Sequence, residues 1–164
     1  FSACWRMNEE LWLKPVQWLT NLKLRASWGK LGNNAIGNYD WQSVYSAANY
    51  STGQALTSGI AITSIANAAL TWEETAVTNV GLDFGFFDNK LHGNIDVYNK
   101  LTTGILYPPD MYMVMGNATA PKANIAEVTN RGVELELGWR DNIGRDFSYS
   151  IKGQFFFNKN FLLI

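Results

Sequence analysis

Apolar and polar side chains alternate along several stretches of the chain, which is the pattern of β-strands with one apolar face. From residue 22 to 28, leucine, alanine and tryptophan alternate with Lys23, Arg25 and Ser27. The same alternation runs through residues 79–86, 91–98, 132–139 and 147–157, and an opening strand at residues 1–7 fits it. The pattern predicts an all-β protein with antiparallel strands.

The connections between these strands are very unequal in length. Residues 88–90 and 141–146 are short and contain Asn or Gly, which supply the positive-φ positions of hairpin turns. Residues 29–74 and 104–127 are long and rich in Gly, Asn, Ser and Thr. Short turns that alternate with long loops are typical of outer-membrane barrels. Any strands within 29–74, such as Trp41–Tyr45, must then come in pairs.

The connection 8–21 does not fit a tight turn. Its first half predicts a helical turn that is capped by Asn8 and closed by Pro15.

Composition narrows the all-β class. The chain has 7 Trp, 7 Tyr, 9 Phe and 14 Gly, and only 16% of its residues are charged. Membrane barrels place aromatic girdles at both interfaces, but a soluble β-sandwich with a large core remains the alternative. The polar face of the strands carries mainly Asn, Gly, Ser, Asp and Glu, with few Lys. Such a face favours a wet barrel lumen over the Lys- and Glu-rich surface of a sandwich.

Charge and chemistry exclude several classes of function. A net charge of −1 gives no basic footprint, so no nucleic-acid partner is expected. Cys4 is single, which rules out an internal disulfide. His92 is the only histidine and is interpreted as a lumen residue rather than a zinc ligand. We expect no enzyme, no catalytic residue, no metal and no cofactor.

Glu134 and Glu136 share one strand face, about 7 Å apart. This spacing does not forbid a glycosidase pair, but a lumen-face network is favoured, in which Arg131, Lys152 and either Lys23 or Arg25 neutralise the two acids.

Aromatic residues in the first long loop are the best candidates for ligand contact. Tyr39, Trp41, Tyr45 and Tyr50 are mixed with Asn and Gln side chains. Aromatic faces next to amides suit sugar binding. The alternative is that these four side chains pack the loop onto the barrel rim or onto a partner. A second cluster, Met111, Met113 and Met115 with Tyr112, suits adaptable contacts or packing.

Five strings, in a fixed order, resemble one family. They are Leu22–Gly29 (LKLRASWG) followed by Gly32-Asn33, Trp72–Thr75 (WEET), Asn79–Gly85 (NVGLDFG), Asp96–Thr102 (DVYNKLT) and Asn130–Leu135 (NRGVEL). In this order they are similar to the barrel of TonB-dependent transporters of the SusC/RagA type. The segment Phe1–Glu10 also resembles the stretch that precedes the first string.

The resemblance implies an outer-membrane protein whose barrel has 22 strands around an N-terminal plug. It also implies a SusD-like surface lipoprotein as partner, TonB as the energy source, contact with outer-membrane lipid, and import of oligosaccharide or peptide. Residues 1–164 would then be a partial barrel domain, a partial arc with long extracellular loops, without the plug and the remaining strands. The last four residues, Phe161–Ile164, are interpreted as the middle of an element. A soluble all-β carbohydrate-binding module is the alternative function.

Overall fold

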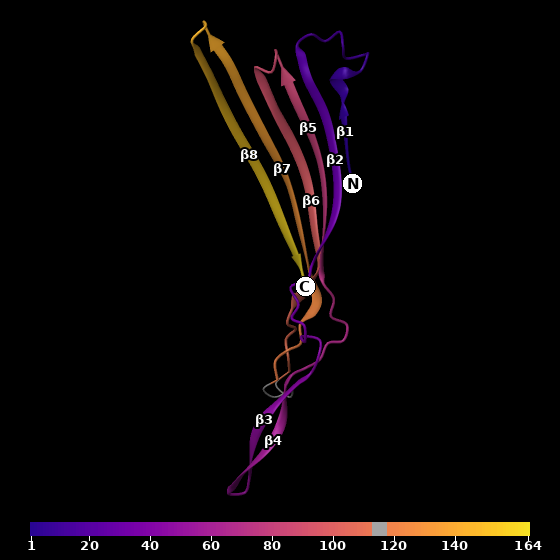
Figure 1. The fold of residues 1–164 in the computed structure, drawn as a ribbon, viewed down its shortest axis with the longest axis vertical. Helices are drawn as coiled ribbons and strands as arrows, with labels where there is room; N and C mark the ends of the chain where they lie inside the picture. The colour runs from indigo at the N-terminus through magenta and orange to yellow at the C-terminus, as the bar shows by residue number, and fades with distance from the viewer. Residues whose placement is uncertain (113–117) are drawn as a thin grey trace. The chain divides into compact units, whose positions relative to one another are not determined.

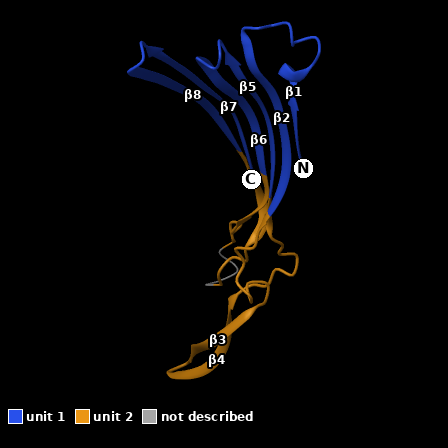
Figure 2. Cartoon of the chain, turned by 45° about the horizontal axis from the view of Figure 1, so that its top comes forward, with its two compact units in different colours: residues 1–31, 75–101, 128–161 blue, residues 32–74, 102–127, 162–164 orange. Residues whose placement is uncertain are grey.

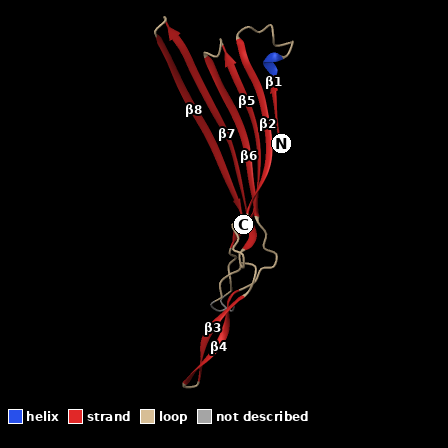
Figure 3. Cartoon of the chain, in the orientation of Figure 1, coloured by secondary structure: helices blue, strands red, loops and turns tan. Residues whose placement is uncertain are grey.

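The computed structural model describes residues 1–112 and 118–164, and its regular elements are almost all strands (Figures 1 and 3). Six strands form one sheet in the order β1-β2-β5-β6-β7-β8, and β3 and β4 form a separate antiparallel hairpin. The elements are β1 (Ser2–Arg6), the 3₁₀-helix η1 (Met7–Glu9), β2 (Leu19–Asn33), β3 (Val44–Thr52), β4 (Ala55–Ser64), β5 (Glu73–Phe86), β6 (Leu91–Tyr107), β7 (Ala123–Ile143) and β8 (Phe147–Leu163).

Two compact units divide the chain (Figure 2). Unit 1 contains residues 1–31, 75–101 and 128–161, which is most of the six-stranded sheet with its short turns. Unit 2 contains residues 32–74, 102–127 and 162–164, which include the long connections and the β3–β4 hairpin. Among the described residues, no helix has the length and hydropathy needed to cross a membrane.

The short turns form as their sequences predict. Phe87, Asp88 and Asn89 have φ values of 54°, 57° and 60°, and the Lys90 N–H closes the turn on the Phe87 carbonyl at 3.1 Å. Asp and Asn tolerate this left-handed conformation better than other side-chain-bearing residues. Gly144, with φ of 70°, does the same for the turn between β7 and β8. The alternating pattern and the turn chemistry therefore agree on an antiparallel order.

The two faces of the unit 1 sheet differ in an unusual way. Apolar side chains on one face stay exposed, including Val97 at 50% and Phe157 at 58%. The polar face holds the more buried positions, such as Asp96 at 8% exposure. Among the described residues, Ala126 is the only buried apolar residue, and no large side chain is fully buried. A soluble sandwich would pack its apolar faces together, so this structure does not agree with that alternative.

Several predicted boundaries need correction. The strands run beyond the alternating stretches, for example to Asn33 in β2 and to Tyr107 in β6. Pairing with neighbouring strands extends them through Gly and Asn residues that have low strand propensity, since tertiary context overrides propensity. Residues 29–74 do contain strands as a pair, but the first begins at Val44, so the predicted strand Trp41–Tyr45 is largely wrong.

The predicted cap at Asn8 is also wrong. The short helix η1 begins at Met7, its N-cap position is Arg6, and no side chain caps it. Asn8 lies inside this turn, where its Oδ1 accepts a hydrogen bond from the Leu22 N–H at 3.4 Å. The side chain therefore ties the connection to the start of β2. Turns follow to Pro15, where the Leu13 N–H bonds the Glu10 carbonyl.

Candidate functional site

The polar face of unit 1 carries an ion-pair network across β2, β5 and β6. The Arg25 guanidinium donates through Nε to Asp83 at 3.0 Å and through an Nη to both carboxylate oxygens of Asp96 at 3.0 and 3.2 Å. Lys23 lies 3.6 Å from Asp83, and the Asn94 amide donates to Asp96 at 2.9 Å. One cation thus bridges carboxylates of two strands, an arrangement that only the strand order β2-β5-β6 allows.

Glycine makes room for this network. A Cβ placed on Gly81 would meet the Asp96 carboxylate and the Arg25 guanidinium. The absence of a side chain at this position of β5 therefore lets the Arg25 side chain cross the strand. This is a close-approach role that glycine in a strand often has.

A second group of polar contacts links β7 and β8. Lys152 Nζ lies 2.5 Å from Glu136, and the Gln154 amide donates to the same carboxylate at 2.7 Å. This confirms Lys152 as a neutralising partner. The prediction for Lys23 and Arg25 is wrong, because they pair with Asp83 and Asp96 instead.

The prediction for Arg131 is also wrong. Its number has the parity of Val133 in β7, so it lies on the apolar face, where its Nε donates to Asn99 at 3.0 Å. Its side chain cannot reach the carboxylates of the polar face.

The polar face offers binding groups rather than reactive ones. Several of its charges are paired, and its amides and carboxylates can exchange hydrogen bonds with hydrated solutes. His92 lies over Gly138, with its Nδ1 3.3 Å from the Asn89 carbonyl. In the described part of the chain, no group of His, Cys, Asp and Glu residues could hold a metal ion. This face is therefore polar and charged.

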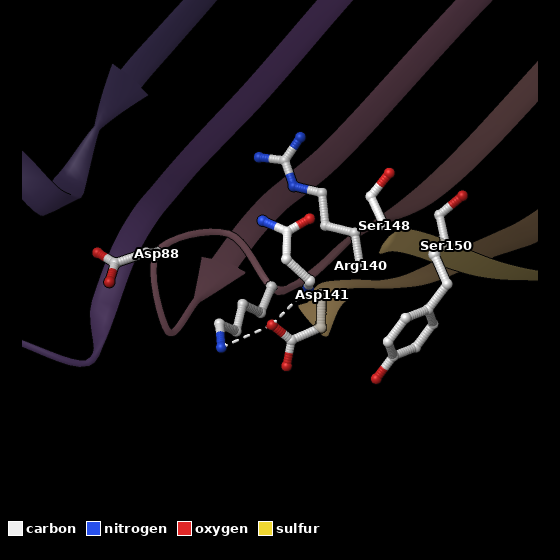
Figure 4. A pocket seen from close by; sticks show the side chains of 8 residues that line it. Asp88, Arg140, Asp141, Ser148 and Ser150 are labelled. Carbon is white, nitrogen blue, oxygen red and sulfur yellow. Dashed lines mark hydrogen bonds and ion pairs between the residues drawn. The ribbon is translucent and has the colours of Figure 1, made fainter. Parts of the chain in front are cut away.

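A shallow hollow of about 470 Å³ lies at the short-turn end of unit 1. Lys90 pairs there with Asp141 at 2.8 Å, and this hydrogen bond raises the pKa of the Lys90 ammonium. Arg140, Ser148 and Ser150 point away from Asp141 (Figure 4). The Arg140 Nε donates to the Asn89 carbonyl at 3.1 Å. Arg140 of β7 therefore holds the turn between β5 and β6 against the neighbouring strand.

In unit 2, one side chain that the sequence did not single out organises the long connections. Asn124 donates to the carbonyls of Thr71 and Gly104, both at 2.7 Å, and accepts from the Thr71 N–H at 2.9 Å. An asparagine can satisfy several backbone groups in this way because its amide both donates and accepts. No hydrophobic period marks such a residue, so pattern analysis could not have found it.

An ion pair also closes the first long loop. Lys122 Nζ lies 2.9 Å from Asp40, whose carboxylate also accepts from the Gly37 N–H at 3.1 Å. The Lys122 ammonium, followed by the Gly37 amide, holds the pKa of Asp40 below its ordinary value of 3.8. Tyr39 and Trp41 flank Asp40 in this loop.

The four predicted ligand-contact aromatics are all exposed but do not form one surface. Tyr39 is 72% exposed, and Trp41 lies beside it with its Nε1 bonded to the Asn38 carbonyl at 3.2 Å. Tyr45 and Tyr50 are both in β3, five residues apart, and therefore lie on opposite faces of the hairpin.

Tyr50 is held within the hairpin. Its ring lies over Gly59, and its hydroxyl donates to the Ile60 carbonyl at 3.1 Å. These contacts are of the kind expected from packing.

In the second predicted cluster, Met111 and Tyr112 are described, and Tyr112 is 83% exposed. Met113 and Met115 lie outside the described residues.

Comparison with known proteins agrees with this geometry. A family model described as "TonB dependent receptor-like, beta-barrel" matches residues 12–161. TonB-dependent receptor P3 of Formosa agariphila is 33% identical over 159 residues, which are 97% of this chain and 16% of the relative. TonB-dependent receptor SusC of Bacteroides thetaiotaomicron is 30% identical over 161 residues, which are 95% of this chain and 16% of SusC.

Solved structures show the same likeness. The structure of the RagAB peptide importer in the "open-open" state superposes with a TM-score of 0.81 at 27% identity, over 97% of this chain and 17% of that chain. The RagAB peptide transporter gives 0.77 at 28% identity, with the same coverage. This chain thus spans about one sixth of the length of these relatives. Both the strand arrangement and the sequence place it in the TonB-dependent receptor-like β-barrel family, among receptors of the SusC/RagA type.

Proposed function

We propose that this chain forms part of the wall of an outer-membrane barrel that imports glycan or peptide nutrients. The observation that carries the proposal is the contrast between the two faces of unit 1. An exposed apolar face suits lipid, and an ion-paired polar face suits a water-filled lumen. In water, the same exposed apolar surface would be an aggregation liability.

The similarity to transporters of the SusC/RagA type supports the partners that we assign to this chain. We assign a SusD-like surface lipoprotein as the partner on the outer side and TonB as the source of energy through a plug domain. The full barrel would then have 22 strands, to which residues 1–164 contribute one arc. The described polar side chains suit hydration and hydrogen bonding of a solute and include no nucleophile with an adjacent base, so the proposal is transport and not catalysis.

The long-connection aromatics form a testable part of this proposal. Tyr39 and Trp41 are exposed and are separated by one residue in the loop, so we assign them to ligand contact. Tyr45 and Tyr50 join them in the proposal as residues that contact either ligand or the lipoprotein. Stacking of a sugar ring or of an aromatic peptide side chain on these faces is the expected chemistry.

Uptake by cells that express the full-length transporter tests this function. The expected result is TonB-dependent uptake of labelled oligosaccharides or of labelled peptides, with loss when the transporter gene is deleted. The double variant Tyr39→Ala/Trp41→Ala should lower uptake, and Leu11→Ala/Trp12→Ala, which removes two exposed side chains from the connection between β1 and β2, is the matched control. Absence of the transporter from the outer-membrane fraction would overturn the proposal.

A further inference from the structure

A groove of about 500 Å³ lies on the apolar face of unit 1. Its walls include the valines Val80, Val97 and Val133 and the ring of Phe157, from β5, β6, β7 and β8. Two cations, Arg131 and Lys159, also line it. The groove therefore combines an exposed apolar floor with concentrated positive charge.

Neither cation is neutralised in the part of the chain that the structure describes. Arg131 uses its Nε for the Asn99 side chain at 3.0 Å, which leaves its other N–H donors available. Lys159 Nζ lies 4.9 Å from the centre of the Phe161 ring, a cation–π contact that leaves the ammonium free to bind an anion. No Asp or Glu is among the residues that line the groove. The groove is thus complementary to an anion that is attached to an apolar body.

The level of the two cations along the strands agrees with a membrane interface. Trp139 donates to the Tyr149 hydroxyl at 3.4 Å and marks an aromatic level near the short turns. Arg131 is eight residues from Trp139 in β7, or about 27 Å along the strand. Tilted strands shorten this to roughly 20 Å across the membrane, close to the height of about 25 Å of the apolar band of such barrels.

A charge on the lipid face is tolerated near an interface but not at the centre of the bilayer. Arg131 and Lys159 on this face therefore point to a specific anionic partner at the interface toward the long connections. Those connections are the outer ones in the proposed orientation. The outer leaflet of an outer membrane consists largely of phosphorylated glycolipids, which combine a phosphate with acyl chains.

We propose that this groove binds one phosphorylated glycolipid of the outer leaflet. Arg131 and Lys159 bind its phosphate, and an acyl chain lies along Val97, Val133 and Phe157. The inference rests on the proposed function, because it requires that the apolar face lie in the outer membrane. It adds a lipid ligand on the outside of the barrel wall, separate from the transported solute.

Lipid binding by the purified full-length transporter tests the proposal. The delipidated protein in detergent is titrated with monophosphoryl lipid A and with the same lipid after removal of the phosphate, and native mass spectrometry counts the bound lipid. Arg131→Gln/Lys159→Gln should weaken binding of the phosphorylated lipid by roughly tenfold or more. Lys14→Gln/Arg145→Gln, which removes two exposed charges at the short-turn end, should leave binding unchanged.

A second variant keeps the charges and fills the groove. Val133→Trp should also weaken binding of the phosphorylated lipid, with the barrel shown to be folded by its migration in unheated gels. Equal affinity of the wild type and the Arg131/Lys159 variant, or binding that ignores the phosphate, would overturn the inference. The inference would also be overturned if that variant no longer formed dimers but still bound the lipid. The face would then be a contact between two copies of the chain. If the transporter is present in the outer membrane but fails these lipid-binding tests, the proposed transport function still holds.

Discussion

Replacing Arg25 by methionine removes the cation that joins two strands of unit 1. The variant keeps an unbranched apolar stem in place of that of arginine but leaves Asp83 and Asp96 without their main partner. The lost contacts are those of 2.8 to 3.2 Å between the guanidinium and the two carboxylates. Two carboxylates that have lost their main cation on a half-buried face should destabilise the sheet.

The expected loss of stability depends on how exposed the side chains of Arg25 and Asp96 are and on the hydrogen-bond donors that remain after the substitution. Removing one partner of a fully buried pair costs about 3–5 kcal/mol, whereas exposed pairs contribute about 0–1 kcal/mol. The Arg25 side chain is 36% exposed and that of Asp96 is 12% exposed, which places the network between these limits. Asn94 still donates to Asp96 after the change. We therefore expect a loss of about 1–2 kcal/mol in the free energy of unfolding, after allowing for solvent screening.

Denaturant unfolding of the full-length transporter in detergent, followed by tryptophan fluorescence, measures this loss. Lys23→Met is the matched control, because it removes only one contact of 3.6 Å and should change the free energy by less than about 0.5 kcal/mol. Neutralising the carboxylates as well, in Arg25→Met/Asp83→Asn/Asp96→Asn, should restore part of the stability. An Arg25→Met variant as stable as the wild type, with no recovery in the triple variant, would show that Arg25 does not stabilise the sheet.

Three further changes test other parts of the structure. Gly81→Ala places a Cβ against the Asp96 carboxylate and should destabilise the barrel by about 1–3 kcal/mol in the same assay. Gly104→Ala forces a side-chain-bearing residue into φ of 67° and should cost about 1–2 kcal/mol, although its Cβ has room. The lowered pKa of Asp40 means that its ion pair stabilises the loop above pH 3.8 and is lost as the pH falls through the folded pKa. Proteolysis of the loop should therefore rise on acidification, and Lys122→Met should raise it already at neutral pH; a pH-independent rate in the wild type would contradict this.

The alternating pattern predicted the strands and the faces because a strand has a period of two, so sequence alone fixes which side chains share a face. It placed Arg25, Asp83 and Asp96 on the polar face in this way. It could not pair them, because pairing depends on strand order and register, which the sequence pattern does not contain. The same gap led to the wrong assignment of Lys23 and Arg25 to Glu134 and Glu136, whereas Arg131 was wrong because its parity puts it on the apolar face.

The long connections were less predictable for a different reason. Hydrogen bonds between single side chains and distant backbone groups, as at Asn124, hold these connections in one conformation. Such contacts leave no periodic pattern in the sequence. The β3–β4 hairpin was expected only as a pair of strands, and its bounds depended on pairing between Val44–Thr52 and Ala55–Ser64. The aromatic positions Tyr45 and Tyr50 were grouped by their proximity in sequence, although β3 places them on opposite faces.

The most direct test of the account is the environment of two adjacent residues of β7. Spin labels are attached at Val133→Cys and at Glu134→Cys in the full-length transporter in lipid bilayers, with Cys4→Ser to remove the exposed native thiol. The two positions have nearly the same depth but lie on opposite faces. We expect oxygen to relax the label at position 133 and a water-soluble nickel chelate to relax the label at position 134. Equal access of the nickel chelate to both labels, or the reverse pattern, would contradict a wall with lipid on its apolar face and water on its polar face.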